Sequence, residues 1–323
     1  MLFDERTMQY FQAIANERNI SRAAEKLYIS QPSLSATVKR IEQQIGYPLF
    51  DRSTKPLGLT ECGARYIRAV EQIMSVEHEF SNFVNDWGDL KTGSLILGGS
   101  SLFSSLVLPS LMGEFSRCFP LVKLTLVEES TARLEELLQQ GSVNLVIDNH
   151  VPDPGLFEHA KFQEESLLLA VPESFAVNQR MGAYQLKLET IYDGSFLEDQ
   201  IAAVPLEEFS QEPFIMLKPE NDTRKRAVRL CQSRGFLPRT IFELDQQMTA
   251  YNITCSGMGI SFVSSTLICR TPPNPGVVYY KLEGEISMRN IYFYWKKGRY
   301  LSRAMEEFLR IAASPAKSPN SLI

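Results

Sequence analysis

The sequence predicts an α/β protein overall, in which a small helical domain and one long helix precede a larger domain of alternating strands and helices. Three observations lead to this prediction. Apolar residues recur at helical spacing in the first 45 residues, no proline occurs from 61 to 90, and apolar strands then alternate with helical segments. At 323 residues the chain is long enough for several domains. We expect domains at 1–60, 61–90 and 91–312, with a flexible tail at 313–323.

The first 60 residues have the pattern of a helix-turn-helix. A second helix is expected to begin at Ser21, as its N-cap, and a third at Ser30 or Gln31 with Pro32 in its first turn. Gly46 ends the third helix. The inward residues of the three helices are predicted to be Phe11, Ile14, Ala15, Ala23, Ala24, Leu27, Leu34, Val38, Ile41 and Ile45.

Two short strands follow, at 49–52 and 57–60, and the loop at 53–56 between them forms a wing. In such a domain the third helix enters the major groove, where short polar side chains suit base edges and cations suit phosphates. The predicted DNA contacts are Arg22, Gln31, Pro32, Ser33, Ser35, Thr37, Lys39, Arg40, Arg52 and Lys55. A helical unit of this size can also serve as a protein adaptor, and that alternative stays open.

Charge is distributed unevenly along the chain. The whole protein has a formal net charge of −5, whereas residues 1–60 contain eight Lys or Arg and six Asp or Glu. This excess of two positive charges predicts weak non-specific affinity of one copy for DNA, so we expect two copies to bind together.

The proline-free stretch predicts a helix of about 45 Å at 1.5 Å per residue. Its apolar stripe is too long to be buried by a 60-residue domain, so we expect a coiled-coil-like dimer. Packing of the stripe on the same chain is the alternative. Residues 87–93 are expected to form a hinge. The predicted dimer seam consists of Tyr66, Val70, Ile73, Phe80, Val84 and Trp87.

In the remaining two-thirds of the chain, the expected strands are continuously apolar. This pattern predicts sheets that are buried on both faces. Expected strands lie at 94–99, 124–127, 144–148, 167–171, 214–217, 241–244, 260–263 and 291–295. Polar residues follow four strands: Ser100 and Ser101, Ser130 and Thr131, Lys218 with Asp222 and Thr223, and Gln246 with Gln247. Ligands of such sheets bind at the carboxyl ends of strands, although helix capping alone also explains these residue types.

The run from Ser21 to Ser35, the wing and the segment 59–63 closely resemble the LysR-type transcriptional regulators, and the resemblance covers almost the full chain. It implies a homodimer or homotetramer that binds double-stranded promoter DNA. It also implies a two-lobed effector domain like the periplasmic solute-binding proteins, with lobe I at about 91–163 and 268–312 and lobe II at about 164–267. The implied effector-binding residues are Ser100, Ser101, Thr131, Asn149, Lys218, Thr223 and Gln246. Lys218 and the helix dipoles favour a small anionic effector, while Asp148 opposes one.

Two features depart from the family pattern. Ala36 stands where many relatives carry a basic residue, so one phosphate contact is missing. The segment 180–212 is longer than usual, either as an insertion beside the cleft or as surface decoration.

Composition and motifs argue against other classes of protein. The five cysteines are scattered and do not form metal-ligand spacings with the three histidines, so we expect reduced thiols, no metal and no cofactor. Nucleophile-turn, P-loop and dinucleotide motifs are absent, which argues against an enzyme with a fused DNA-binding segment. A solute-binding protein would need an export signal. We therefore expect a cytoplasmic protein that does not bind membranes.

Overall fold

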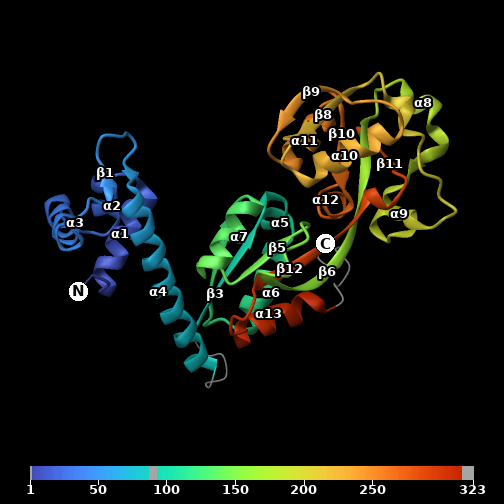
Figure 1. Cartoon of the computed structure of the whole chain (residues 1–323). Coiled ribbons are helices and arrows are strands. Elements are labelled where there is room, and N and C mark those ends of the chain that lie inside the picture. The colour runs from blue at the N-terminus through green and yellow to red at the C-terminus, as the bar shows by residue number, and fades with distance from the viewer. Residues whose placement is uncertain (1, 87–92, 315–323) are drawn as a thin grey trace. The chain divides into compact units, whose positions relative to one another are not determined.

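The computed structural model describes residues 2–86 and 93–314. They form two compact units, one containing the N-terminal helices with most of the long helix, the other nearly all of the remainder. The first unit contains α1 (Glu5–Glu17), α2 (Ile20–Lys26), α3 (Gln31–Ile45), β1 (Phe50–Asp51), β2 (Gly58–Leu59) and α4 (Glu61–Asp86) (Figure 1). This order confirms the predicted winged helix-turn-helix.

The caps of the short helices follow local sequence. The prediction that Ser21 caps α2 is wrong, because the Asn19 side chain accepts hydrogen bonds from the backbone N–H groups of Ser21 and Arg22 at 2.9 and 3.1 Å. Asparagine is an equally good cap and stands two residues earlier, so the helix starts at Ile20. Of the two residues predicted as possible caps of α3, Ser30 rather than Gln31 is the cap, and Gly46 ends that helix with a φ of +85°.

The wing and α4 are packed tightly against the core of the first unit. A Cβ added to Gly63 would lie 1.8 Å from the carbonyl oxygen of Leu49, so only glycine permits this approach of the helix to the wing. β1 and β2 pair antiparallel, with Phe50 opposite Leu59. The core beneath them joins α1, α2, α3 and the first turns of α4.

The start of α4 corrects part of the predicted dimer seam. Tyr66 and Val70 are buried in the core of their own unit, where Tyr66 stacks on Phe3 and meets the edge of Phe11. They point at α1, so they cannot form a seam with another copy. Ile73 lies at the margin of the same core, and Trp87 lies outside the described residues. Of the remaining predicted residues, Phe80 and Val84 are exposed.

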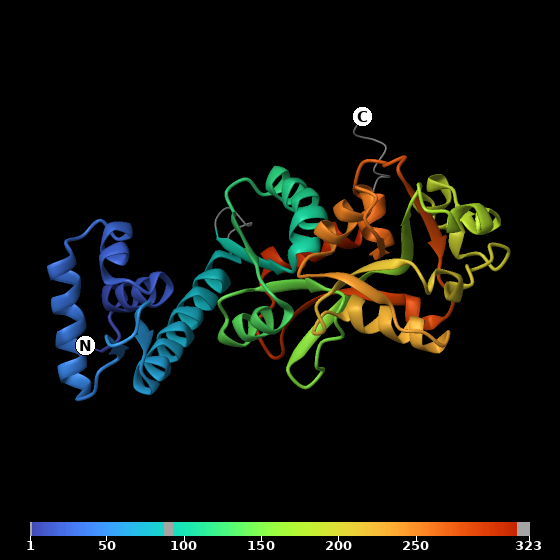
Figure 2. The same cartoon turned by 90° about the horizontal axis from the view of Figure 1, so that it is seen from above.

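The second unit contains two sheets that share one long strand, β6 (Phe157–Pro172) (Figures 1 and 2). The first sheet has the order β4-β3-β5-β12-β6, and the second continues as β10-β8-β9 on one side of β6 and β11-β7 on the other. The other strands are β3 (Ser94–Gly99), β4 (Lys123–Glu128), β5 (Leu145–Asp148), β7 (Gln185–Leu186), β8 (Pro213–Leu217), β9 (Arg239–Leu244), β10 (Ile260–Ser264), β11 (Val277–Lys281) and β12 (Met288–Lys296).

Helices cover both faces of each sheet, as the continuous apolar strands predict. In the first lobe, one face carries the core of Phe115, Phe293 and Phe308, and the other carries Leu134 and Leu138. The first-lobe helices are α5 (Ser101–Leu106), α6 (Leu108–Cys118), α7 (Thr131–Gln140) and α13 (Arg303–Ala313). The second-lobe helices are α8 (Val177–Arg180), α9 (Leu188–Tyr192), α10 (Asp222–Ser233), α11 (Gln247–Cys255) and α12 (Ser265–Cys269), with 3₁₀ turns η1 (Gly182–Tyr184), η2 (Ser195–Leu197), η3 (Leu206–Phe209) and η4 (Glu285–Ser287).

Two predictions about the second unit need correction. The return to lobe I at residue 268 is too early, because β11 pairs with β6 and β7 of the second sheet and the chain returns only at about 288. The segment 180–212 is not surface decoration, because it buries Ile191, Phe196, Leu206 and Phe209 in the second lobe.

Candidate DNA-binding and effector-binding sites

The third helix has two distinct faces. Leu34, Val38 and Ile41 are fully buried, whereas Gln31, Pro32, Ser33, Lys39 and Arg40 are exposed and Ser35 and Thr37 are half-buried. The Thr37 hydroxyl donates to the Ser33 carbonyl at 3.1 Å, which leaves it free to accept from DNA but not to donate. The predicted reading face therefore lies on one side of one helix, and Ala36 is exposed on it.

The wing is attached to α3 by one carboxylate. Glu42 accepts hydrogen bonds from the backbone N–H groups of Leu49 and Phe50 at 2.8 and 3.3 Å, and it pairs with Arg52 at 3.3 Å. Arg52 is thus partly neutralised within the protein. Lys55 and Arg22 are exposed, and their side chains form no hydrogen bond or ion pair with other described residues.

A buried polar network crosses the second unit from the first lobe to the second. At its centre, Arg289 of β12 donates to Glu165 of β6 at 2.7 Å, to Asp222 at 2.8 Å and to Thr223 at 3.0 Å. Asn149, which follows β5, donates to the same Glu165 oxygen at 3.2 Å. The two crossing strands are therefore joined to the end of β5 in one lobe and the start of α10 in the other.

The network continues into each lobe. In the first lobe, Thr131 at the start of α7 donates to Asp148 at 2.6 Å, and the Asn149 backbone N–H donates to the other Asp148 oxygen. In the second lobe, Gln247 lies 3.5 Å from the Thr223 hydroxyl and accepts from Ser264 at 3.0 Å. Thus three predicted effector residues, Thr131, Asn149 and Thr223, belong to one connected set.

Burial and neighbouring charges shift the pKa values of this network in different directions. Burial raises the pKa of Asp148, against the opposing effect of its hydrogen bond from Thr131. Burial alone would raise the pKa of Asp222, but Arg289 and Arg226 outweigh it and the pKa lies below its ordinary value. Burial likewise opposes the charge of Arg289, but Glu165 and Asp222 raise the pKa of its guanidinium. Arg289 is therefore a paired cation.

The other predicted effector residues are less constrained. Ser100 and Ser101 begin α5, and the Ser100 side chain makes no capping bond. Lys218 pairs with Asp245 at 2.7 Å, so its charge is already matched, and Gln246 is exposed before α11. A cavity in the second lobe is lined by none of the seven predicted residues.

Sequence reasoning missed Glu165, Arg289 and Gln247. Glu165 lies in a polar run of β6 and Arg289 near the start of β12, and only the pairing of these two strands brings them together. Gln247 was noted only as part of a polar strand end. The described residues contain no cluster of three or more His, Cys, Asp or Glu side chains arranged for a metal ion. No described helix is both long and apolar enough to cross a membrane.

Comparison with known proteins agrees with this architecture. Residues 6–64 match the model of bacterial regulatory helix-turn-helix proteins of the lysR family, and residues 88–315 match the LysR substrate binding domain. An uncharacterized HTH-type transcriptional regulator of Bacillus subtilis is 27% identical over 97% of this chain and 95% of its own length. A probable RuBisCO transcriptional regulator of Guillardia theta is 26% identical over 93% and 92%.

Solved structures share the fold. The crystal structure of full-length CbnR complexed with its target DNA superposes with a TM-score of 0.64 at 19% identity, covering 96% of this chain and 99% of that one. Full-length OxyR from Pseudomonas aeruginosa gives a TM-score of 0.67 at 18% identity over 97% and 98%.

A winged helix-turn-helix joined by a long helix to a two-lobed α/β domain defines an effector-responsive transcription regulator rather than an enzyme. The chain belongs to the LysR family of transcriptional regulators.

Proposed function

We propose that this regulator acts in the cytoplasm as a homodimer or homotetramer, reads promoter DNA with α3 and the wing, and responds to a small polar effector held between its two lobes. The main support is the division of α3 into a fully buried apolar face and an exposed polar one. Such a helix in a winged domain is built to enter a groove rather than to complete a core.

The residues of α3 and the wing divide into two roles in this proposal. Gln31, Ser33 and Ser35, at the N-terminal end of α3, contact base edges. Lys39, Arg40 and Lys55 contact phosphates, together with Arg22, Pro32 and Thr37 near the backbone. Because Arg52 is paired with Glu42, we expect it to contribute less to the salt dependence than Lys55.

The oligomer is proposed to form through the distal part of α4. Val76 and Phe80 are 66% and 67% exposed, and Val84 follows Phe80 by one turn on the same face. Large apolar side chains on one face of a helix favour a partner surface.

The effector is proposed to contact Ser100, Ser101, Thr131, Asn149, Thr223 and Gln246. Glu165 Oε2 and Arg289 Nη2 have no hydrogen-bond partner among the described residues, so the centre of the network has capacity for one more donor and one more acceptor. Lys218 and Arg289 are both paired with carboxylates, so neither offers an unmatched positive charge to an anionic effector. We therefore propose a small polar metabolite with hydroxyl and carbonyl or carboxyl groups.

A thermal-shift screen of the full chain with matched acids and amides tests this proposal. We expect a polar hit that raises the melting temperature and changes the footprint on DNA, and that loses its effect in the Ser101→Ala, Thr131→Ala double variant. Ser105→Ala, on the exposed side of the same α5, is the control. If the hit stabilised the double variant as much as the wild type, the cleft would not be the effector site.

A further inference from the structure

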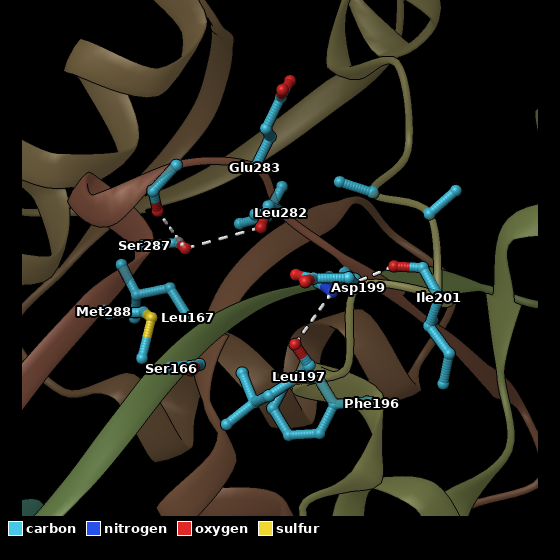
Figure 3. Close-up of a pocket in the computed structure, with 14 residues that line it drawn as sticks. Ser166, Leu167, Phe196, Leu197, Asp199, Ile201, Leu282, Glu283, Ser287 and Met288 are labelled. Atoms are coloured by element: carbon cyan, nitrogen blue, oxygen red, sulfur yellow. Dashed lines mark hydrogen bonds between the residues drawn. The ribbon is translucent and has the colours of Figure 1, made fainter.

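The second lobe contains a cavity of about 480 Å³, shown in Figure 3 with the residues that line it. Its walls come from β6, from residues 196–203 and from the connection that leads through η4 into β12. Ser166 and Met288 pair across the two crossing strands, and each directly adjoins a network residue, Glu165 or Arg289. The cavity therefore begins one residue away from the network on each crossing strand, and none of its lining residues belongs to the network.

The volume and walls of the cavity suit a small organic molecule. A cavity of this size falls within the range of ligand pockets. Leu167, Phe196 and Leu282 are almost fully buried and provide an apolar lining, while Leu197 and Met288 are partly exposed at its margin. The walls can therefore hold an apolar body of the size of one aromatic ring.

Lys281 shapes the cavity but cannot donate to a ligand. Its ammonium donates to the carbonyl oxygens of Leu197, Glu198 and Ile201 at 3.3, 2.9 and 2.9 Å. An ammonium has three donors, so all of them are used within the protein. Lys281 thus fixes the backbone of the 197–201 loop at the wall of the cavity, and Figure 3 marks its contacts with Leu197 and Ile201 as dashed lines.

The unused polar groups of the cavity are mainly acceptors. Asp199 has no hydrogen-bond or ion-pair partner among the described residues, and the Ser166 hydroxyl, though Ser166 is only 4% exposed, has none either. Glu283 pairs with Arg234, and Ser287 donates to backbone carbonyls. A bound molecule would therefore have to supply donors, and a positive charge would be matched by Asp199.

We propose that this cavity is a second small-molecule site, distinct from the cleft between the lobes, which binds an amphipathic amine. The apolar body lies against Phe196 and Leu167, the ammonium contacts Asp199, and the Ser166 hydroxyl accepts or donates a further hydrogen bond. The segment 180–212, which is unusually long in the sequence, supplies one wall of this site.

Three probes of similar size and different charge test the proposal on the full chain: 2-phenylethylamine, 2-phenylethanol and phenylacetate. By titration calorimetry or ligand-observed NMR, we expect the amine to bind about fivefold more tightly than phenylacetate. Asp199→Asn should reduce the affinity for the amine to that for the alcohol. Glu207→Gln, an exposed carboxylate of the same lobe outside the cavity, should leave binding unchanged.

A substitution that fills the cavity provides an independent test of the proposal. Ala202 lines it from an exposed position, so Ala202→Phe should occupy the space with little effect on folding and abolish binding of all three probes. The proposal is overturned if the amine does not bind, if phenylacetate binds as tightly, or if Asp199→Asn leaves the affinity for the amine unchanged. None of these results depends on the effector cleft, whose residues are intact in every variant.

Discussion

At the scale of single residues, the most informative group is the buried carboxyl of Asp148. It is 3% exposed at the end of β5 and is held by Thr131 and by the backbone of Asn149. A carboxylate removed from water favours its protonated form, and burial does raise the pKa of Asp148. The stability of the first lobe is therefore expected to depend on pH through Asp148, which lies close to the proposed effector site.

The sign of this dependence can be predicted. Because the folded pKa of Asp148 is raised, the folded protein binds the proton more tightly than the unfolded chain, whose pKa is about 3.9. The wild type should therefore gain stability relative to Asp148→Asn as the pH falls through the raised pKa towards about 4. Melting temperatures between pH 7.5 and 4.5 measure this. A difference in melting temperature between wild type and Asp148→Asn that does not change with pH would contradict this prediction. Thr131→Val removes a hydrogen bond that lowers the pKa of Asp148, so it should shift the pH dependence of stability to higher pH.

The roles of single residues could be predicted from the sequence where neighbouring residues alone determine them. The polar face of α3 could be predicted, because helical spacing separates it from Leu34, Val38 and Ile41. The pair of Glu165 and Arg289 could not, because 123 residues separate them along the chain and no local pattern marks a partner. The start of α2 shows a smaller limit, since Asn19 and Ser21 are both good capping residues and lie only two positions apart.

At the scale of elements, the contact of α4 with the wing sets the shape of the first unit. Gly63 lies against the Leu49 backbone, and Thr60 reinforces the same junction, its hydroxyl donating to the Pro48 carbonyl at 2.7 Å. Because the obstacle is backbone rather than a flexible side chain, the junction cannot relax cheaply around a larger residue.

Gly63→Ala should destabilise the first unit by about 1–3 kcal/mol, since either α4 or the wing must move. The matched control is Gly113→Ala in α6, where nothing lies within 4 Å of the added methyl group. That change should be neutral or stabilise by up to about 1 kcal/mol, because alanine is the better helix former. Urea unfolding followed by fluorescence compares the two. Equal effects would show that the close approach of Gly63 is unimportant.

Elements were predictable from sequence where they were continuously apolar or strongly periodic. The strands at 94–99, 145–148, 213–217 and 260–264 were expected almost as observed. The first half of β6 was missed, because its residues from Phe157 to Glu165 are mainly polar or half-exposed. β11 was also missed, and with it the true return to the first lobe, because five residues after a proline-rich turn carry little periodicity.

At the scale of the whole molecule, the apolar stripe of α4 serves two purposes. Its first part, with Tyr66 and Val70, completes the core of its own unit, and burial raises the pKa of the Tyr66 hydroxyl to about 12. Only the later part, from Val76 to Val84, offers side chains to a partner. The sequence pattern alone could not divide the stripe, because both uses require the same spacing.

Phe80→Asp should therefore weaken the dimer strongly, since it would place a carboxylate against an apolar partner surface. Val70→Asp should instead unfold the first unit, because Val70 is fully buried within it. Analytical ultracentrifugation and circular dichroism together separate the two outcomes. A Phe80→Asp protein that remains a dimer of unchanged strength would move the interface to the second unit.

The central claim is that α3 reads a DNA sequence, and selection of bound fragments from genomic DNA tests it most directly. The wild type should enrich two similar half-sites on one face of the duplex, with centres about 34 Å or a multiple apart. Gln31→Ala with Ser35→Ala should change the preferred bases, at about 1–3 kcal/mol for each lost base contact. Arg229→Ala, exposed on α10, should select the same sites as the wild type. If the wild type enriched no sequence, or the double variant selected identical sites with equal affinity, the claim would be contradicted.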